Sequence, residues 1–229
     1  MRYVFLLIGL VFYGLGYSQE VTIDSLDTKY REDQFYVSIS YNLLTNGPDG
    51  FSQNGISTGF HLGFIRDMPI NKRRNWAIGL GFGLSSNSYN QELRIAENSG
   101  EFSYSIIDDS EINVSKNKFT RYLLEVPLEL RWRSSNASKY KFWRIYSGIK
   151  LGYLAYSTAK FKSSMGDITV SNIEDFNTFQ YGLTLSAGYN TWNFQLYYGL
   201  NNLFNETAQI DGESINLRAV KIGIIFYIL

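Results

Sequence analysis

Charged side chains that could do chemistry are concentrated in two neighbouring segments near the middle of the chain. Between residues 121 and 150 they lie on one face of each predicted strand: Glu125, Glu129, Arg131, Arg144 and Lys150. We assume a register that pairs Arg133 with Phe142 across the intervening turn. In that register Glu125 lies opposite Lys150. Glu129 then lies diagonal to Arg144.

Carboxylates beside cations allow two interpretations. One is an ion path or a catalytic carboxylate pair. The other is a structural network of salt bridges that fills a narrow interior, since eight strands leave room for side chains only. We favour the structural network, because buried charges are normally paired for reasons of solvation alone.

The chain has one histidine, His61, and no cysteine. Disulfides, cysteine-ligated metals and multi-histidine metal sites are therefore excluded. His61 could serve a serine hydrolase as general base, but no Gly-x-Ser-x-Gly motif accompanies it. We interpret His61 as a hydrogen-bonded histidine on the polar face of its strand. We predict no catalytic residue, no metal and no cofactor.

The elements that must position these residues are β-strands. After Ser18 no apolar run is long enough for a membrane helix. Instead, apolar and polar residues alternate with period two. Eight segments show this alternation: residues 35–43, 56–64, 76–85, 121–133, 143–153, 179–189, 192–200 and 220–229.

The two faces of these segments differ in a way that predicts their surroundings. One face carries large apolar and aromatic residues, and the other carries glycine, hydroxyl and charged residues. A soluble sandwich or lipocalin-like barrel would have its charged face outside. Small residues fit the inside of a narrow barrel, whereas bulky apolar ones can face lipid. We therefore predict an all-β fold, an eight-stranded antiparallel transmembrane barrel of the outer membrane.

Link lengths and tryptophans predict the orientation of this barrel. Residues 66–75, 134–141 and 190–191 form short links, whereas 47–54, 86–118, 157–177 and 201–214 form mostly longer ones. Short turns are periplasmic in such barrels, so we predict a periplasmic N-terminus. The tryptophans all lie on the apolar face near short links and predict a periplasmic aromatic girdle: Trp76, Trp132, Trp143 and Trp192.

Basic residues gather in the same short links. They are Lys72, Arg73, Arg74, Lys139 and Lys141. They form either a solvated surface or a basic rim for a periplasmic partner. Overall, 21 basic residues balance 21 acidic ones, so we predict no nucleic-acid partner.

The N-terminus has the layout of a secretory signal. Met1-Arg2 is basic, residues 3–15 are almost wholly apolar, and Gly16 and Ser18 are small residues before a cleavage position. An uncleaved anchor would need about 20 apolar residues to span a bilayer. We predict a cleaved signal peptide at 1–18, a periplasmic segment at 19–32 and the barrel at 33–229.

Several segments resemble one family. The segments 63–75, Arg131-Trp132-Arg133-Ser134-Ser135, Phe142-Trp143-Arg144-Ile145-Tyr146 and the ending Phe226-Tyr227-Ile228-Leu229 resemble PorT-type outer-membrane barrels of Bacteroidetes. The resemblance implies a non-enzymatic accessory barrel of type IX secretion and gliding motility. Its partners would be outer-membrane lipid and proteins of the secretion machinery. It implies no site residues, and the oligomeric state stays open.

Two other functions remain open from the residues themselves. One is a small passive pore, or a barrel that binds ligands through its acid-rich long loops. The other is an outer-membrane hydrolase acting in the lumen or at the rim, which the missing catalytic constellation disfavours.

Overall fold

A computed structural model describes residues 33–98, 100–107, 113–134, 142–164 and 166–228. The predicted signal peptide (1–18) and N-terminal segment (19–32) lie outside these residues. In the part of the chain that is described, no helix has the length and apolarity needed to cross a membrane.

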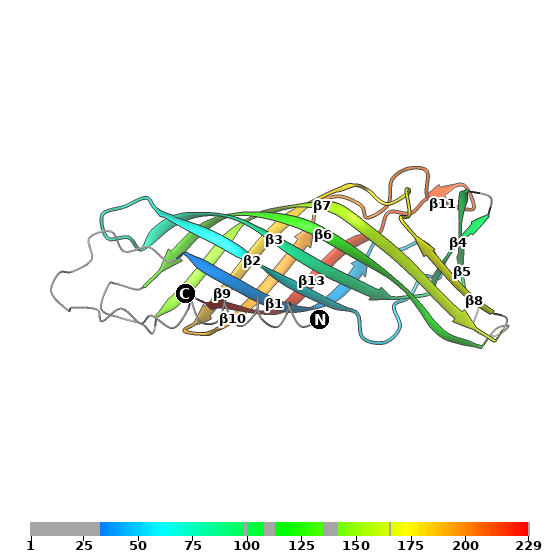
Figure 1. Cartoon of the computed structure of the whole chain (residues 1–229), viewed down its shortest axis with the longest axis horizontal. Coiled ribbons are helices and arrows are strands. Elements are labelled where there is room, and N and C mark those ends of the chain that lie inside the picture. Colours follow the sequence, from blue (N-terminus) through cyan, green and yellow to red (C-terminus); the bar gives the residue numbers. More distant parts are fainter. Residues whose placement is uncertain (1–32, 99, 108–112, 135–141, 165, 229) are drawn as a thin grey trace, which may run out of the picture.

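Eight antiparallel strands close into one barrel (Figure 1). The strands run in the order β6–β3–β2–β1–β13–β10–β9–β7, and β7 pairs again with β6. Their bounds are β1 Gln34–Thr45, β2 Thr58–Pro69, β3 Trp76–Asn90, β6 Val114–Arg133, β7 Trp143–Ser163, β9 Phe179–Tyr189, β10 Trp192–Gly199 and β13 Arg218–Ile228. The predicted fold class is thereby confirmed.

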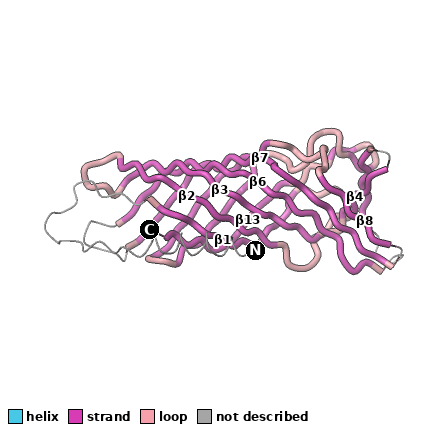
Figure 2. The backbone as a smooth tube through the Cα atoms, viewed as in Figure 1, coloured by secondary structure: helices cyan, strands magenta, loops and turns pink. Residues whose placement is uncertain are grey.

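The two ends of the barrel differ in their connections. We call the end with the short links, residues 70–75, 134–142 and 190–191, the turn end; it lies at the left of Figure 1. The other end, which we call the loop end, carries smaller strands. They are β4 Leu93–Asn98, β5 Glu101–Ile106, β8 Gly166–Ser171, β11 Gln209–Ile210 and β12 Glu213–Ser214. Figure 2 shows that strands, joined by loops, continue to the loop end.

The links predicted at 86–118 and 157–177 are long, but their predicted bounds are wrong: the barrel strands leave 91–113 and 164–178 between them. Strand β3 continues to Asn90, β6 already begins at Val114, and β7 continues to Ser163. Between them β4 pairs with β5, and β8 pairs with β7. The alternation persists in these extensions, but its outward residues are serine, threonine, asparagine and lysine. A prediction based on an apolar outer face therefore stops too early.

Across most of the barrel the apolar side chains are exposed on the outside and the polar ones are buried inside, the opposite of a water-soluble protein. Along β9 every odd-numbered residue is exposed and every even-numbered residue is buried. The exposed face is apolar, as with Phe82, which is 63% exposed. On β6 this apolar belt runs from Trp132 to Tyr122, about 33 Å along the strand at ~3.3 Å per residue. A tilt of roughly 40° reduces that to about 25 Å, the height of the lipid-facing band of such barrels.

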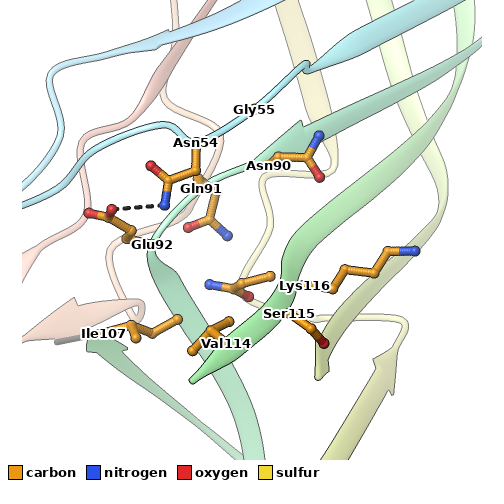
Figure 3. A pocket seen from close by; sticks show the side chains of 10 residues that line it. Asn54, Gly55, Asn90, Gln91, Glu92, Ile107, Val114, Ser115 and Lys116 are labelled. Atoms are coloured by element: carbon orange, nitrogen blue, oxygen red, sulfur yellow. Dashed lines mark hydrogen bonds between the residues drawn. The ribbon is translucent and has the colours of Figure 1, made fainter. Parts of the chain in front are cut away.

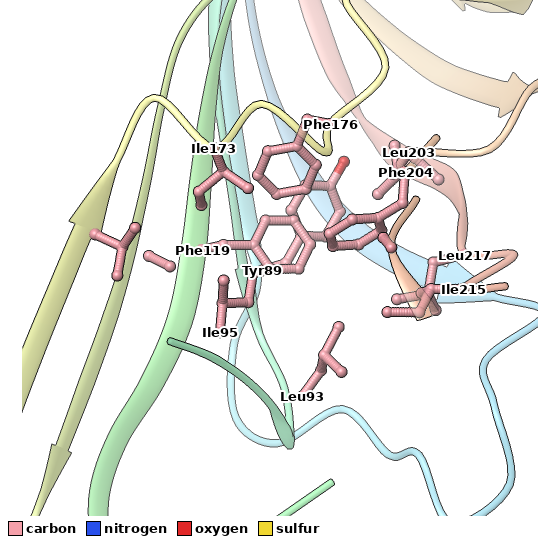
Figure 4. Packing of buried hydrophobic residues seen from close by; sticks show 14 of the residues in the cluster. Tyr89, Leu93, Ile95, Phe119, Ile173, Phe176, Leu203, Phe204, Ile215 and Leu217 are labelled. Carbon is pink, nitrogen blue, oxygen red and sulfur yellow. The ribbon is translucent and has the colours of Figure 1, made fainter. Parts of the chain in front are cut away.

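The loop end contains an ordinary hydrophobic core (Figure 4). Phe119 on β6 packs against Phe176, with ring centroids 5.3 Å apart, and Phe176 packs against Phe204 at 4.5 Å. Leu93 and Leu217 are fully buried beside them. Apolar side chains from four connecting segments thus close this end of the barrel from within.

Candidate functional site: the charged lumen

A carboxylate between two nitrogen groups occupies the middle of the lumen. Glu125 on β6 accepts from His61 on β2, with 3.1 Å from His61 Nδ1 to each carboxylate oxygen. Lys150 Nζ on β7 lies 3.1 Å from Glu125 Oε2. All three side chains are buried. Each of the three points inward, because both of its neighbours in sequence are apolar residues exposed on the outer face.

The space around this cluster is almost completely filled. A cavity of about 10 Å³ lies between His61, Lys150, Gln195, Tyr197 and Lys221. That volume accommodates about one water molecule. The arrangement can hold charge in the interior, but it offers no continuous aqueous path at this level.

The observed register between β6 and β7 differs by two residues from the predicted one. Arg133 pairs with Arg144, so Glu125 lies opposite Gly152 and reaches Lys150 diagonally. Ser134 N donates to the carbonyl of Trp143 at 3.0 Å, so the pairing in the observed register extends to these two residues. Register follows turn geometry, which the alternation does not contain.

The same shift changes the surroundings of Glu129 and Arg144. Glu129 lies opposite Gly148, and its Oε2 is 3.6 Å from Nε of Arg131. Arg144 instead packs over the ring of Phe142 at 4.1 Å and donates to the carbonyl of Asn190. The structure therefore does not bring Glu129 and Arg144 together as diagonal partners.

A second network fills the turn end of the lumen. Asp67 on β2 accepts from Arg131 and from Arg133, each at 2.9 Å, and all three side chains are fully buried. Arg131 also donates to Gln34 and lies 4.1 Å above the ring of Tyr146. One carboxylate thus holds two guanidinium groups in the interior.

Sequence reasoning missed Asp67, because it assigned residues 66–75 to a link. Strand β2 continues to Pro69, so His61, Ile65 and Asp67 all point inward. The prediction ended the strand where Arg66 interrupts the apolar outer face. The period-two spacing of inward residues from His61 to Asp67 is the signal that could have found it.

Arg121 marks the loop-end limit of the charged lumen. Its guanidinium lies 4.9 Å above the ring of Phe176 and donates to the carbonyl of Asn177 at 3.0 Å. Beyond it the interior is apolar. Among the described residues, ion pairs thus occupy the lumen from Asp67 to Glu125, and the hydrophobic core occupies it beyond Arg121.

His61 has an acidic partner that the sequence did not reveal, but no nucleophile is hydrogen-bonded to it among the described residues. The nearby Ser40 hydroxyl donates to Asn42 Oδ1 at 2.8 Å. His61 is only 3% exposed. A substrate has no route to this histidine, so the geometry favours a structural role.

Two polar pockets lie at the loop end. One, of about 360 Å³, is lined by carboxamides of Asn54, Asn90 and Gln91 and by Glu92, which accepts from Asn54 at 2.8 Å (Figure 3). The other, of about 680 Å³, has five asparagines and Arg218 among the residues that line it. A carboxamide carries both donors and acceptors, so linings rich in asparagine suit ligands rich in hydroxyl groups. The carboxamide of Gln91 is bonded to the backbone of Leu93.

The predicted rim residues that the structure describes lie at the turn end. Trp76 pairs with Trp132, while Trp143 and Trp192 both pair with Tyr189, all on the outer face. Lys72 and Arg73 are exposed in the 70–75 turn, and Arg74 is half-buried. Lys139 and Lys141 lie outside the described residues.

Comparisons with known proteins give one family and a few distant structures. A family model described as outer membrane protein beta-barrel domain matches residues 17–205. Ail, the attachment invasion locus protein of Yersinia pestis, is 12% identical over 86% of this chain and 97% of its own, with a TM-score of 0.38. The structure of Ail in complex with the heparin analogue sucrose octasulfate is 14% identical over 86% of this chain and 99% of its own, with a TM-score of 0.39.

A mutant porin of Rh. blastica is 8% identical over 87% of this chain and 100% of its own, with a TM-score of 0.21. No curated protein sequence matches this chain. At these identities the likeness to the solved structures concerns the fold alone.

Proposed function

Because this chain belongs to the family of outer membrane protein beta-barrel domains, we propose that it is a sealed, non-enzymatic barrel that assists protein secretion. The bacterial outer membrane is the location that this family implies. The resemblance to PorT-type barrels supports a more particular role, as an accessory or assembly component of type IX secretion and gliding motility. Secretion-machinery proteins would then be its partners.

The filled lumen is the observation that carries this proposal. Asp67 and Glu125 each hold cations inside the barrel, and the core around Phe119 closes the loop end. Such an interior favours neither transport of solutes nor catalysis in the lumen. The two rims and the lipid-facing wall remain as surfaces through which the protein would act.

We also propose that the turn end faces the periplasm. Its short links support this orientation, as does the placement of the tryptophans on one side. Lys72 and Arg73 would then be available to a periplasmic protein. The predicted signal peptide at 1–18 agrees with export, and it remains a prediction.

Thiol labelling tests the orientation, since the parent chain has no cysteine. Asn98→Cys at the loop end should react with an impermeant maleimide on intact cells, and Lys72→Cys should react only after the outer membrane is opened. Both residues are exposed. The reverse pattern would overturn the orientation and leave the fold untouched.

Deletion of the gene, followed by analysis of the secreted proteins, tests the function. We expect cargo export to fail and to return with the parent gene. A complementing gene with Lys72→Gln and Arg73→Gln tests the basic rim separately. In planar bilayers the purified barrel should show no steady conductance. Normal export together with steady conductance would identify a passive pore instead.

A surface-binding barrel is the second candidate, and the two polar pockets favour it. Asn54 and Asn90 line one pocket beside Glu92. A glycan array probed with the purified barrel tests this function, with Asn54→Ala, a change of an exposed residue, as the pocket variant. Specific binding by the parent that Asn54→Ala loses, together with normal cargo export in the deletion strain, would favour this candidate over secretion.

A further inference from the structure

Four lysines gather on the outer face of β6 and β7, on the loop-end side of the apolar belt. Lys118 pairs directly with Lys160, and Lys116 pairs directly with Lys162. Phe119 and Phe161, their neighbours in sequence, are buried inside, so the lysines belong to the opposite face. We call these four residues the lysine patch.

The fold itself does not explain this arrangement. Like charges directly opposite each other destabilise a pair of strands. Lys162 has one acidic partner, Asp167 on β8, at 2.9 Å. Within the described part of the chain, Lys116, Lys118 and Lys160 have no ion pair. Partial burial and the charges of Lys116 and Lys160 lower the pKa of Lys118. Among the described residues, one carboxylate, that of Asp167, thus accompanies four lysines.

The position of the patch relative to the belt indicates where an anion would come from. Tyr122 and Tyr156 form the last aromatic pair of the belt, with ring centroids 5.8 Å apart. Lys118 lies four residues from Tyr122 on the loop-end side, about 13 Å along the strand at ~3.3 Å per residue. With a tilt of roughly 40° this is about 10 Å along the membrane normal.

A headgroup layer begins at the end of the apolar belt and is roughly 5–8 Å thick. The lysine ammonium groups, on long flexible stems, can reach back into that layer. Between the tyrosines and the lysines lies one row of hydroxyl residues that pair across four strands: Ser88, Thr120, Thr158 and Ser171. The order of these features matches the parts of a lipid: the apolar belt lies at the level of the acyl chains, the tyrosines and hydroxyl row at the level of the ester region, and the lysines at the level of the phosphate.

We propose that the lysine patch binds the phosphorylated headgroups of anionic lipids in the leaflet around the loop end. The inference rests on the proposed membrane location of the barrel. Lipid phosphate would relieve the repulsion between Lys118 and Lys160, which no described side chain relieves. Binding would be confined to the side of the barrel formed by β6, β7 and β8. Lys116 also borders the smaller polar pocket (Figure 3), where a bound headgroup could extend.

Lipid retention measures this binding. The full barrel is placed in nanodiscs with equal parts of phosphatidylglycerol and phosphatidylcholine and then released into mild detergent. Native mass spectrometry identifies the lipids that remain bound to it. We expect the parent to retain phosphatidylglycerol preferentially. The variant Lys118→Gln/Lys160→Gln should lose about fivefold of that preference for each lysine. Lys72→Gln/Arg73→Gln, which removes two charges at the turn end, is the matched control and should keep the preference.

Further arms separate the alternatives. Millimolar inorganic phosphate should leave the bound lipid in place; displacement would point to a soluble anion and overturn the lipid assignment. Lys118→Arg/Lys160→Arg should retain the lipid, and in discs of phosphatidylcholine alone the glutamine variant should be at least as heat-resistant as the parent. Equal lipid retention by parent and glutamine variant, or an equal loss in the control, would overturn the proposal.

The result is independent of orientation and of secretion, because both leaflets of the nanodisc have the same composition. A barrel that prefers phosphatidylglycerol but is dispensable for export would contradict the proposed function and leave the lysine patch intact. A barrel that export requires but that shows no preference for phosphatidylglycerol would contradict the lysine patch and leave the proposed function intact.

Discussion

The middle of the barrel and its loop end solve the problem of burial in opposite ways. On the inward face of β6, Glu125 is held by His61 and Lys150, whereas Phe119, six residues away on the same face, packs only among apolar rings. Outside, the same strand changes from leucine and valine to threonine and lysine.

The difference follows from the surrounding solvent. Where lipid covers the wall, apolar residues gain nothing by moving inward, so the interior can be assembled from paired charges. Where water covers it, apolar side chains must be buried to stabilise the fold. Arg121 stands at the change, with its guanidinium over Phe176. Each half can therefore be broken separately, and the two should respond differently.

The largest loss is expected from Asp67→Asn. This change leaves the fully buried guanidinium groups of Arg131 and Arg133 without the carboxylate that both contact. Removing one partner of a buried ion pair costs about 3–5 kcal/mol. Chemical unfolding in detergent micelles measures it. Asp49→Asn, an exposed change at the loop end, should stay within roughly 0.5 kcal/mol; equal losses in both variants would mean that the lumenal network carries no stability.

Phe204→Ala should cause a loss of similar kind but confined to the loop end. Phe204 is 1% exposed and packs against Phe119 and Phe176, and truncating such a ring costs about 3–5 kcal/mol locally. Amide hydrogen exchange should rise in β4 and β5 and stay low in β9 and β10. Phe82→Ala on the lipid-facing wall is the control and should leave that exchange unchanged. A uniform rise in exchange would show that the two regions unfold together.

The contact between Glu125 and Lys150 should show a coupling of roughly 1–3 kcal/mol. Lys150→Met alone removes the ammonium group in contact with the Glu125 carboxylate and should destabilise the barrel or admit ions. Glu125→Gln with Lys150→Met should recover part of the loss, because the orphan charge is gone. A double-mutant cycle on thermal unfolding, run beside bilayer conductance, measures both. Strictly additive losses would mean that this contact contributes nothing.

The smallest effect is expected from Tyr104→Phe at the loop end. Tyr104 donates to Asp175 Oδ2 at 2.8 Å, a bond that contributes about 0.5–1.5 kcal/mol net. Burial, followed by this bond and the charge of Asp175, raises the pKa of Tyr104. A raised pKa favours the protonated folded form, so this stabilisation is complete below about pH 10 and is lost as the pH rises above it.

Protease sensitivity of the loop end between pH 8 and 11 tests this. The parent should become more sensitive at the alkaline end, and the difference between parent and Tyr104→Phe should shrink there. A difference that stays constant across the range would assign the effect to packing of the ring.

The outer wall was predictable from the sequence because lipid imposes a strict apolar alternation, and all eight barrel strands were found by it. The prediction failed where that demand ends, as at Ser86–Asn90 in β3 and at Arg66, which hides Asp67. The register between β6 and β7 depends on a turn that alternation does not describe. Contacts such as Tyr104 with Asp175 join segments with no shared local pattern, so no periodicity reveals them.

The tryptophans have a practical consequence. All four, Trp76, Trp132, Trp143 and Trp192, lie beside the short links at one end of the barrel. Tryptophan emission from the unlabelled protein, separated from that of the 18 tyrosines by selective excitation, would therefore come from a single monolayer. A brominated lipid confined to that monolayer would dim the emission, and the same lipid in the opposite monolayer would leave it bright. Tryptophan fluorescence would thus report the orientation in which the barrel has inserted into the membrane.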